Sequence, residues 1–266
     1  MKIAVCVKQV PEGNSVKLDP VSHTLIRKKS GNMLNQADLF AVEAAITLKE
    51  ETDAQLEAIT MGPDSAEAVL RDVIAMGADG GTLLSSEDFI GSDTYGTSLV
   101  LASALGELGG VDVVFCGARS SDGDTGQTGA FLAAHLGIPY FSRVLSVCSD
   151  EEGLIITREA GTRKEKLLVK PPVLISVEEN ANKPRYATLK RLLYSLDTDI
   201  RRLDGKRLVP NPKAAAIGRY SPTQVTEVCQ ERADAAECIF LSEGRKTEAV
   251  IDALEGCLKE AGCFNV

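Results

Sequence analysis

The stretch that decides the fold is VDVVFCGARSSDGDTGQTG, residues 111–129. Its first part, Val111–Cys116, is a continuous apolar run, which is typical of a strand covered on both faces. Gly117 ends this run, and small and polar residues then lead into helical spacing over Thr125–Leu136. A buried strand, a turn of small residues and a helix in this order predict one unit of a parallel α/β sheet.

The same alternation of strand and helix fills the rest of the first half of the chain. Strands are expected over Lys2–Val10, Gln55–Met61 and Gly80–Ser85, and helices over Asp38–Glu51, Ser65–Met76 and Thr94–Leu108. Asn35 and Asp38 are candidate caps of the first helix, and Val16–Arg27 is compatible with a hairpin. The pattern predicts a Rossmann-like α/β fold, a mostly parallel twisted sheet with helices on both faces. Ligands of such sheets bind beyond the carboxyl ends of the strands.

The second half of the chain has a different pattern. Short antiparallel or edge strands are expected over Val144–Val147, Leu154–Arg158, Glu165–Lys170 and Val173–Val177. From Asn182 to about Thr226 the chain is rich in proline, lysine and arginine and shows no clear core periodicity, whereas Lys246–Ala261 has the apolar spacing of a helix. We therefore expect an α/β domain over residues 1–180 and a recognition loop with an extended C-terminal arm over residues 181–266.

Composition excludes several classes of protein. The chain has 266 residues, of which 44% are hydrophobic and 25% charged, and these values are ordinary for a globular protein. Its net charge of -9 argues against a nucleic-acid partner. Because the sequence has no membrane-spanning apolar run and no signal-peptide pattern, we expect a cytoplasmic protein without membrane insertion. The seven cysteines are scattered without a CxxC pair, so reduced thiols are expected rather than a metal site.

The turn after Val111–Cys116 carries the chemistry that the residues themselves suggest. Its small residues let backbone N–H groups approach a phosphate, and the start of the following helix adds partial positive charge. The alternative is a tight turn capped by Asp122 or Asp124, and the residues leave both interpretations open. The two aspartates argue against a densely anionic ligand unless they face a ribose or a metal. No Ser–His–Asp, Cys–His or paired-carboxylate pattern stands out, so no catalytic residue is assigned.

Several segments resemble the β subunits of electron transfer flavoproteins. They are Val7–Pro11, Asn35–Glu43, Met61–Pro63, Ala75–Asp79, Ser92–Thr94, Asp122–Gln127, Asn182–Leu189 and Ser221–Val225. The run NKPRYATL, residues 182–189, resembles the family's NEPRYATL-like signature. Each segment alone is weak, but they occur in the family's order from Lys2 to about Leu258 and together are highly specific.

The resemblance implies a subunit that binds an adenine nucleotide, usually AMP, beside a larger α subunit that holds the electron-transferring FAD. Matching motifs place the nucleotide contacts at Cys6, Asn35, Asp38, Met61, Gly117, Asp122, Thr125, Gly126, Gln127 and Thr128. The loop that ends at Leu189 resembles the family's docking loop for partner dehydrogenases of the acyl-CoA dehydrogenase type. Leu189 is then the anchor, with Tyr186 and Arg185 beside it.

One branch of the family holds a second FAD in place of AMP. There NADH is the donor, and electrons pass both to ferredoxin or flavodoxin and to the α-subunit FAD. Val7–Pro11 and Asp122–Thr125 resemble this bifurcating branch more, and Gly123 leaves room for an isoalloxazine ring. Arg119 stands one position later than the branch's arginine, yet its guanidinium can still pair with flavin or phosphate. The alternatives are an AMP-binding subunit of a simple electron carrier, a non-redox nucleotide-binding module and a structural subunit with an empty site.

Two further departures concern the other motifs. Gln36 and Ala37 stand where the family has Pro-Phe at the start of the first helix. Lys183 replaces an acidic residue of the signature run, and this change bears on the choice of partner dehydrogenase.

Overall fold

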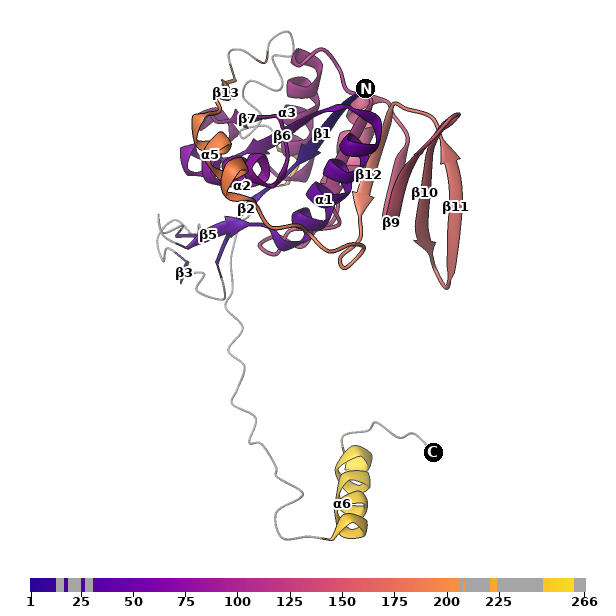
Figure 1. The fold of residues 1–266 in the computed structure, drawn as a ribbon. Helices are drawn as coiled ribbons and strands as arrows, with labels where there is room; N and C mark the ends of the chain where they lie inside the picture. Colours follow the sequence, from indigo (N-terminus) through magenta and orange to yellow (C-terminus); the bar gives the residue numbers. More distant parts are fainter. Residues whose placement is uncertain are drawn as a thin grey trace. The chain divides into compact units, whose positions relative to one another are not determined.

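The computed structural model describes residues 1–12, 17–18, 25–26, 31–205, 208, 221–223 and 246–260 (Figure 1). The chain divides into two compact units, Met1–Thr226 and Glu227–Val266. The first unit carries the sheet and all the elements discussed below except the last helix.

A nine-stranded sheet forms the centre of the first unit, in the order β11-β10-β9-β12-β8-β1-β6-β7-β13. The parallel strands are β1 (Lys2–Cys6), β6 (Gln55–Met61), β7 (Gly80–Leu84), β8 (Val113–Gly117), β12 (Val173–Val177) and β13 (Ile200–Leu203). At one edge β9 (Tyr140–Asp150) joins β12 in parallel and continues antiparallel into β10 (Gly153–Ala160) and β11 (Arg163–Val169). The predicted mostly parallel sheet is therefore confirmed.

Helices cover both faces of the sheet. Alternate residues of each strand point to opposite sides, and both sets of side chains are apolar and need to be buried. One face packs under α1 (Gln36–Thr52) and α2 (Glu67–Met76), and the other under α3 (Thr94–Glu107) and α4 (Thr128–Leu136) (Figure 1). Within β8, Phe115 belongs to the first core and Val114 to the second, and both are fully buried. The apolar run that predicted this strand thus reflects two covered faces.

The order of the strands creates a switch point beside β1. The chain runs from β1 through β6 to β7 on one side, and then returns through α3 to β8 on the other side. The crevice at such a point, outside the carboxyl ends of the strands, is where ligands of open α/β sheets bind. Here those ends are formed by Cys6 and Gly117, with Cys6 in register with Cys116.

The first predicted strand is shorter than expected. β1 ends at Cys6, and β2 (Gln9–Pro11) leaves the main sheet to pair with β5 (Asn32–Leu34). The expected hairpin is present as β3 (Lys17–Leu18) paired antiparallel with β4 (Leu25–Ile26). Because β1 stops early, Lys8 lies at the carboxyl edge rather than within the sheet.

The segment after Asn182, which was expected to be an extended arm without core periodicity, contains two regular elements within residues 189–203. The structure places α5 (Leu189–Asp197) there, followed by β13, which extends the sheet beyond β7. Arg71 of α2 donates to the carbonyls of Ser195 and Leu196, and Arg191 of α5 donates to carbonyls of Ile74 and Ala78. Leu189, Leu192, Leu193 and Leu196 have the spacing of a helix, but they face solvent, and arginines rather than a buried apolar stripe hold α5.

The remaining differences are at the ends of elements. α1 begins at Gln36 rather than Asp38, α4 begins at Thr128 rather than Thr125, and β9 already begins at Tyr140. Two short 3-10 turns, η1 (Asp64–Ala66) and η2 (Glu87–Phe89), follow β6 and β7. In the second unit α6 (Thr247–Glu260) confirms the final helix.

Most of the expected extended arm, residues 209–220 and 224–245, lies outside the described residues. None of the helices in the described parts of the chain is long and apolar enough to cross a membrane.

Candidate functional site

The first turn of α1 closes the crevice between β1 and β8. Asp38, only 6% exposed, accepts a hydrogen bond from the backbone N–H of Lys8 at 2.8 Å and another from the backbone N–H of Gly117. Burial raises the pKa of Asp38 to about 7, although the bonds from Asn35, Lys8 and Gly117 favour its charged form. One carboxyl group therefore joins the ends of two strands to a helix.

Gly117 is required by the close approach of α1. A Cβ atom at this position would lie 2.8 Å from the carbonyl carbon of Ala37 and would also meet the carboxylate of Asp38. Backbone cannot give way cheaply at that distance. The absence of a side chain lets the loop that follows β8 rest directly against the first turn of α1.

Asn35 fixes the next part of this loop. Its Nδ2 donates to the carbonyl of Arg119 at 2.8 Å, and its Oδ1 accepts from the N–H of Ser121 at 3.2 Å. Although Asn35 occupies the N-cap position of α1, its side chain makes no capping hydrogen bond. The prediction of a helix cap was therefore wrong for the side chain, which instead holds the loop.

Both aspartates of the loop are paired with cations. Lys8 Nζ lies 2.6 Å from Asp122 Oδ1 and 3.4 Å from Ser120 Oγ. Burial raises the pKa of Asp122, but the hydrogen bond and charge of Lys8 outweigh it, so the net shift is downward. Asp124 lies 3.4 Å from the guanidinium of Arg119. The negative charge that argued against an anionic ligand is thus largely compensated.

Arg119 also reaches away from the loop. Its Nε donates to Glu179 Oε1 at 2.9 Å, and its side chain is about half exposed. Glu179 follows β12 and precedes the NKPRYATL run. Arg119 therefore links the loop to the chain that leads into the candidate docking segment through an ion pair that solvent screens.

The last part of the loop is open to solvent. Asp124 and Gly126 adopt left-handed backbone conformations, with φ angles of 46° and 59°. Residues 123–127 are exposed, and Gln127 occupies the N-cap position of α4 without a capping hydrogen bond from its side chain. Because no N-cap side chain bonds the first N–H groups of α4, this edge has the chemistry of an anion site.

The start of α3 lies beside the start of α4. Thr94 Oγ1 donates to Gln127 Oε1 at 3.3 Å. Asp93 caps α3 through the N–H of Gly96, and its other oxygen accepts from the N–H and hydroxyl of Thr223. The described part of the Ser221–Val225 motif is therefore tied to the same edge of the sheet.

The structure brings most of the predicted nucleotide contacts to one edge. Those around the ends of β1 and β8 are Cys6, Asn35, Asp38, Gly117, Arg119 and Asp122, and the connected loop into α4 holds Gly123, Thr125, Gly126, Gln127 and Thr128. Met61 ends the neighbouring strand β6 and packs on the α3 and α4 side, as Cys6 and Cys116 do. Burial raises the pKa of both thiols, so neither is a poised nucleophile.

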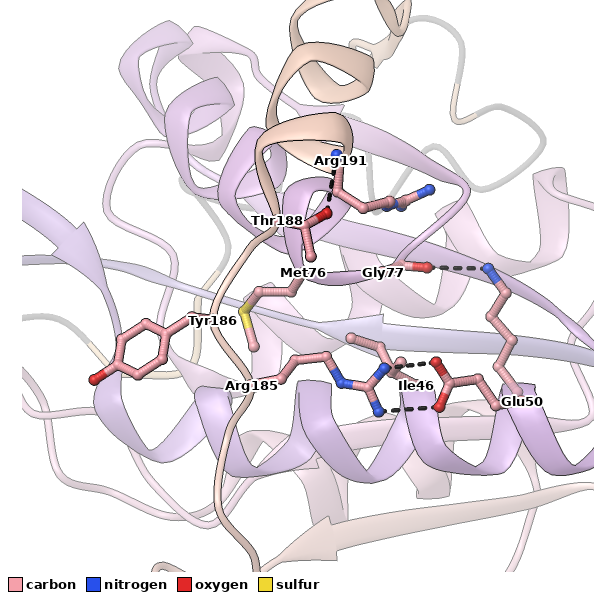
Figure 2. A pocket seen from close by; sticks show the side chains of 9 residues that line it. Ile46, Glu50, Met76, Gly77, Arg185, Tyr186, Thr188 and Arg191 are labelled. Atoms are coloured by element: carbon pink, nitrogen blue, oxygen red, sulfur yellow. Dashed lines mark hydrogen bonds and ion pairs between the residues drawn. The ribbon is translucent and has the colours of Figure 1, made fainter.

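The candidate docking segment lies further along α1. Arg185 makes paired hydrogen bonds to Glu43 and Glu50, as Figure 2 shows for Glu50. Tyr186 is 96% exposed and points away from the pocket of about 290 Å³ beside it, and Leu189 is 73% exposed. Arg185 is thus occupied in holding the segment, whereas Tyr186 and Leu189 are presented to solvent.

Comparison with known proteins identifies the family. The model of the electron transfer flavoprotein domain matches residues 22–201. The chain is 36% identical to electron transfer flavoprotein subunit beta of Thermoanaerobacterium thermosaccharolyticum, with 96% of this chain and 97% of that protein covered. This chain belongs to the electron transfer flavoprotein β-subunit family.

Other members of the family are similar over comparable lengths. Electron transfer flavoprotein subunit beta of Megasphaera elsdenii is 35% identical, with 95% of this chain and 96% of that protein covered. The caffeyl-CoA reductase-Etf complex subunit CarD of Acetobacterium woodii is 35% identical, with 85% of this chain and 86% of that protein covered. The resemblance drawn from the motifs is confirmed.

Two groups of residues in this family member were not given a role from the sequence. Lys8 lies within the Val7–Pro11 motif. Because β1 ends at Cys6, Lys8 is free of the sheet and its ammonium group reaches Asp122, which the sequence alone does not show. Glu43 and Glu50 lie seven positions apart on one face of α1, where they bind Arg185 from a distant part of the chain. The helical spacing of the two glutamates was a visible signal, but their partner was not.

We predict that Gly117→Ala lowers the free energy of unfolding by about 1–3 kcal/mol, because the new Cβ collides with the backbone of α1. Urea unfolding of the purified subunit measures the change. Gly123→Ala is the matched control, since its nearest neighbour, Ser120 Oγ, lies 3.9 Å away and its stability should be unaltered. Equal losses of unfolding free energy in the two variants would show that contact with α1 is not what requires glycine at position 117.

We also predict a pH-dependent effect of Asp38→Asn. Because the folded state raises the pKa of Asp38 from 3.8 to about 7, its stabilising contribution is full below about pH 4 and is lost as the pH rises towards 7. The stability of the variant relative to wild type should therefore rise between about pH 5 and pH 7, by on the order of 1 kcal/mol per pH unit. Urea unfolding of nucleotide-free protein at both pH values tests this. A difference independent of pH would contradict it.

Proposed function

We propose that this β subunit binds an adenine nucleotide at the switch point between β1 and β8 and pairs with an α subunit that carries FAD. The observation that supports the proposal is the loop of residues 117–127 at the carboxyl edge of the sheet. Asn35 and Lys8 anchor this loop, and both of its aspartates have cationic partners. A loop fixed at its start and open at its end suits a ligand with a phosphate.

The chemistry of the edge fits a nucleotide rather than a small anion. Backbone N–H groups at the start of α4 favour phosphate oxygens. The hydroxyl groups of Thr125 and Thr128 and the amide of Gln127 offer further hydrogen bonds. Cys6 and Met61 end strands on the α3 and α4 side, where they provide an apolar surface for a ring.

We further propose that the nucleotide is FAD and that the α–β complex performs electron bifurcation. Gly123 has no atom other than Ser120 Oγ within 4 Å of its virtual Cβ, so a flat ring is not obstructed there. Arg119 is exposed and held only by screened ion pairs, so its guanidinium can turn to a flavin or phosphate oxygen. Bound FAD would supply the ability to take two electrons from NADH and release them singly.

The partners proposed for the complex follow from the same branch of the family. Electrons would pass to ferredoxin or flavodoxin and, through the FAD of the α subunit, to a dehydrogenase of the acyl-CoA dehydrogenase type. Two relatives support the last partner by name: the acryloyl-CoA reductase electron transfer subunit gamma of Anaerotignum propionicum, 38% identical, and the caffeyl-CoA reductase-Etf complex subunit. The competing function is an AMP-binding subunit of a simple electron carrier.

The two exposed parts of the chain have separate proposed partners. Tyr186 and Leu189 would dock on the dehydrogenase, with Arg185 holding their segment against α1. The C-terminal arm would pack on the α subunit. In its own unit α6 has no buried residue and exposes Ile251 and Leu254, as expected of a helix whose apolar side is covered in a complex.

The nucleotide content of the purified α–β complex tests the proposed cofactor. After denaturation, the released nucleotides are separated and quantified. Two FAD per heterodimer are expected, one from each subunit. One FAD with one AMP would replace bifurcation with simple electron transfer and remove the flavin role of Arg119. One FAD and no second nucleotide would contradict nucleotide binding by this subunit.

Leu189→Ala tests the docking segment. Loss of an exposed leucine that fills a pocket of the partner should slow electron transfer between the complex and its acyl-CoA dehydrogenase by about tenfold. Stopped-flow flavin absorbance measures the rate, and the nucleotide content should not change. Ile90→Ala, at a site of similar exposure, is the control. An unaltered rate in Leu189→Ala would place the docking surface elsewhere.

A further inference from the structure

Lys8 connects three parts of the nucleotide edge. It lies two residues after the end of β1, and its backbone N–H donates to Asp38 in the first turn of α1. Its carbonyl accepts a hydrogen bond from the N–H of Asn35 at 2.9 Å. Its ammonium group then reaches across to Ser120 and Asp122 in the loop after β8. A single residue thus bonds to the start of α1 and to the loop after β8.

The ammonium group of Lys8 satisfies a carboxylate that water hardly reaches. The side chain of Asp122 is 7% exposed, whereas that of Lys8 is 42% exposed. A buried carboxylate without a cation is costly, but an unpaired lysine with this exposure is not. Among the residues that the structure describes, Lys8 is the cation that forms an ion pair with Asp122. Arg119, the other cation of the loop, is engaged with Asp124 and Glu179.

The conformation of the loop depends on where Asp122 lies. Two residues later, Asp124 has a left-handed backbone and donates its N–H to the carbonyl of Ser120 at 2.8 Å. This closed turn presents Gly123 and Thr125 to solvent. If Asp122 turned outward to water, the turn would be pulled open together with the residues that follow it.

We propose that Lys8 is a positioning residue of the nucleotide site: it neutralises Asp122 and so holds the loop in its binding conformation, without contacting the nucleotide. The inference rests on the proposed nucleotide site and adds to it the residue that shapes it. It predicts that the need for Lys8 disappears once Asp122 carries no charge.

A double-mutant cycle in the α–β complex tests this interaction. Wild type, Lys8→Met, Asp122→Asn and the double variant are stripped of nucleotide and titrated separately with AMP and with FAD. For the nucleotide that wild type binds, Lys8→Met should weaken affinity by about tenfold or more, since it leaves a buried carboxylate unpaired. Asp122→Asn should cost about threefold or less, and the double variant should recover to the level of Asp122→Asn.

Hydrogen exchange of the loop gives a second readout that does not need a ligand. In stripped complex, Lys8→Met should accelerate exchange of the Asp124 amide, and the double variant should restore its protection. The melting temperature of each complex controls for general loss of fold. Because the double variant contains no buried unpaired charge, it remains testable even where Lys8→Met assembles poorly.

The outcomes separate the alternatives. If Lys8→Met and the double variant bound nucleotide equally weakly while the loop amides of both stayed protected from hydrogen exchange, Lys8 would be a direct ligand. This result would overturn the positioning role. If Lys8→Met had the nucleotide affinity and the loop hydrogen exchange of wild type, Lys8 would have no role at this site. Failure of wild type to bind either AMP or FAD would count against the proposed function, while the exchange experiment would still decide whether Lys8 holds the loop.

Discussion

The carboxyl group of Asp38 holds together the crevice around which the rest of the site is built. It accepts hydrogen bonds from the backbone after β1 and from Gly117 at the end of β8, and Gly117 has no side chain to keep α1 away. The cost of burying this group appears as its raised pKa. β1 and β8 pair directly in the sheet, but the segments that follow them share no connecting turn, so the terminus of α1 fixes these two segments relative to each other.

α1 also joins the two candidate functional regions of the first unit. Asn35 and Asp38 at its start hold the loop of the proposed nucleotide site, and Glu43 and Glu50 further along hold Arg185 of the candidate docking segment. Asn182 adds a hydrogen bond to the carbonyl of Phe40. A helix of 17 residues therefore sets the position of the candidate docking segment relative to the proposed nucleotide edge.

Hydrophobic patterning predicted the parts of the fold that bury apolar faces, but it could not show which elements are attached by polar groups. β8 and the helices of the alternating half were visible because their side chains fill two cores. The leucines of α5 have helical spacing too, but they face solvent, and the attachment of this helix through Arg71 and Arg191 left no trace in the pattern. The motifs pointed to residues that the structure gathers at one edge of the sheet, but the pairing of Lys8 with Asp122 depends on strands that are far apart in sequence.

The contacts that attach α5 to the domain do not involve the side chains on its outer surface. Arginine side chains bind main-chain carbonyls at both ends of the contact, and every amino acid supplies such a carbonyl. Leu192, Leu193 and Leu196 can therefore be exchanged during evolution without loosening the helix. A protein built in this way can change the outer surface of a helix by altering a few residues while the sheet beneath it stays the same.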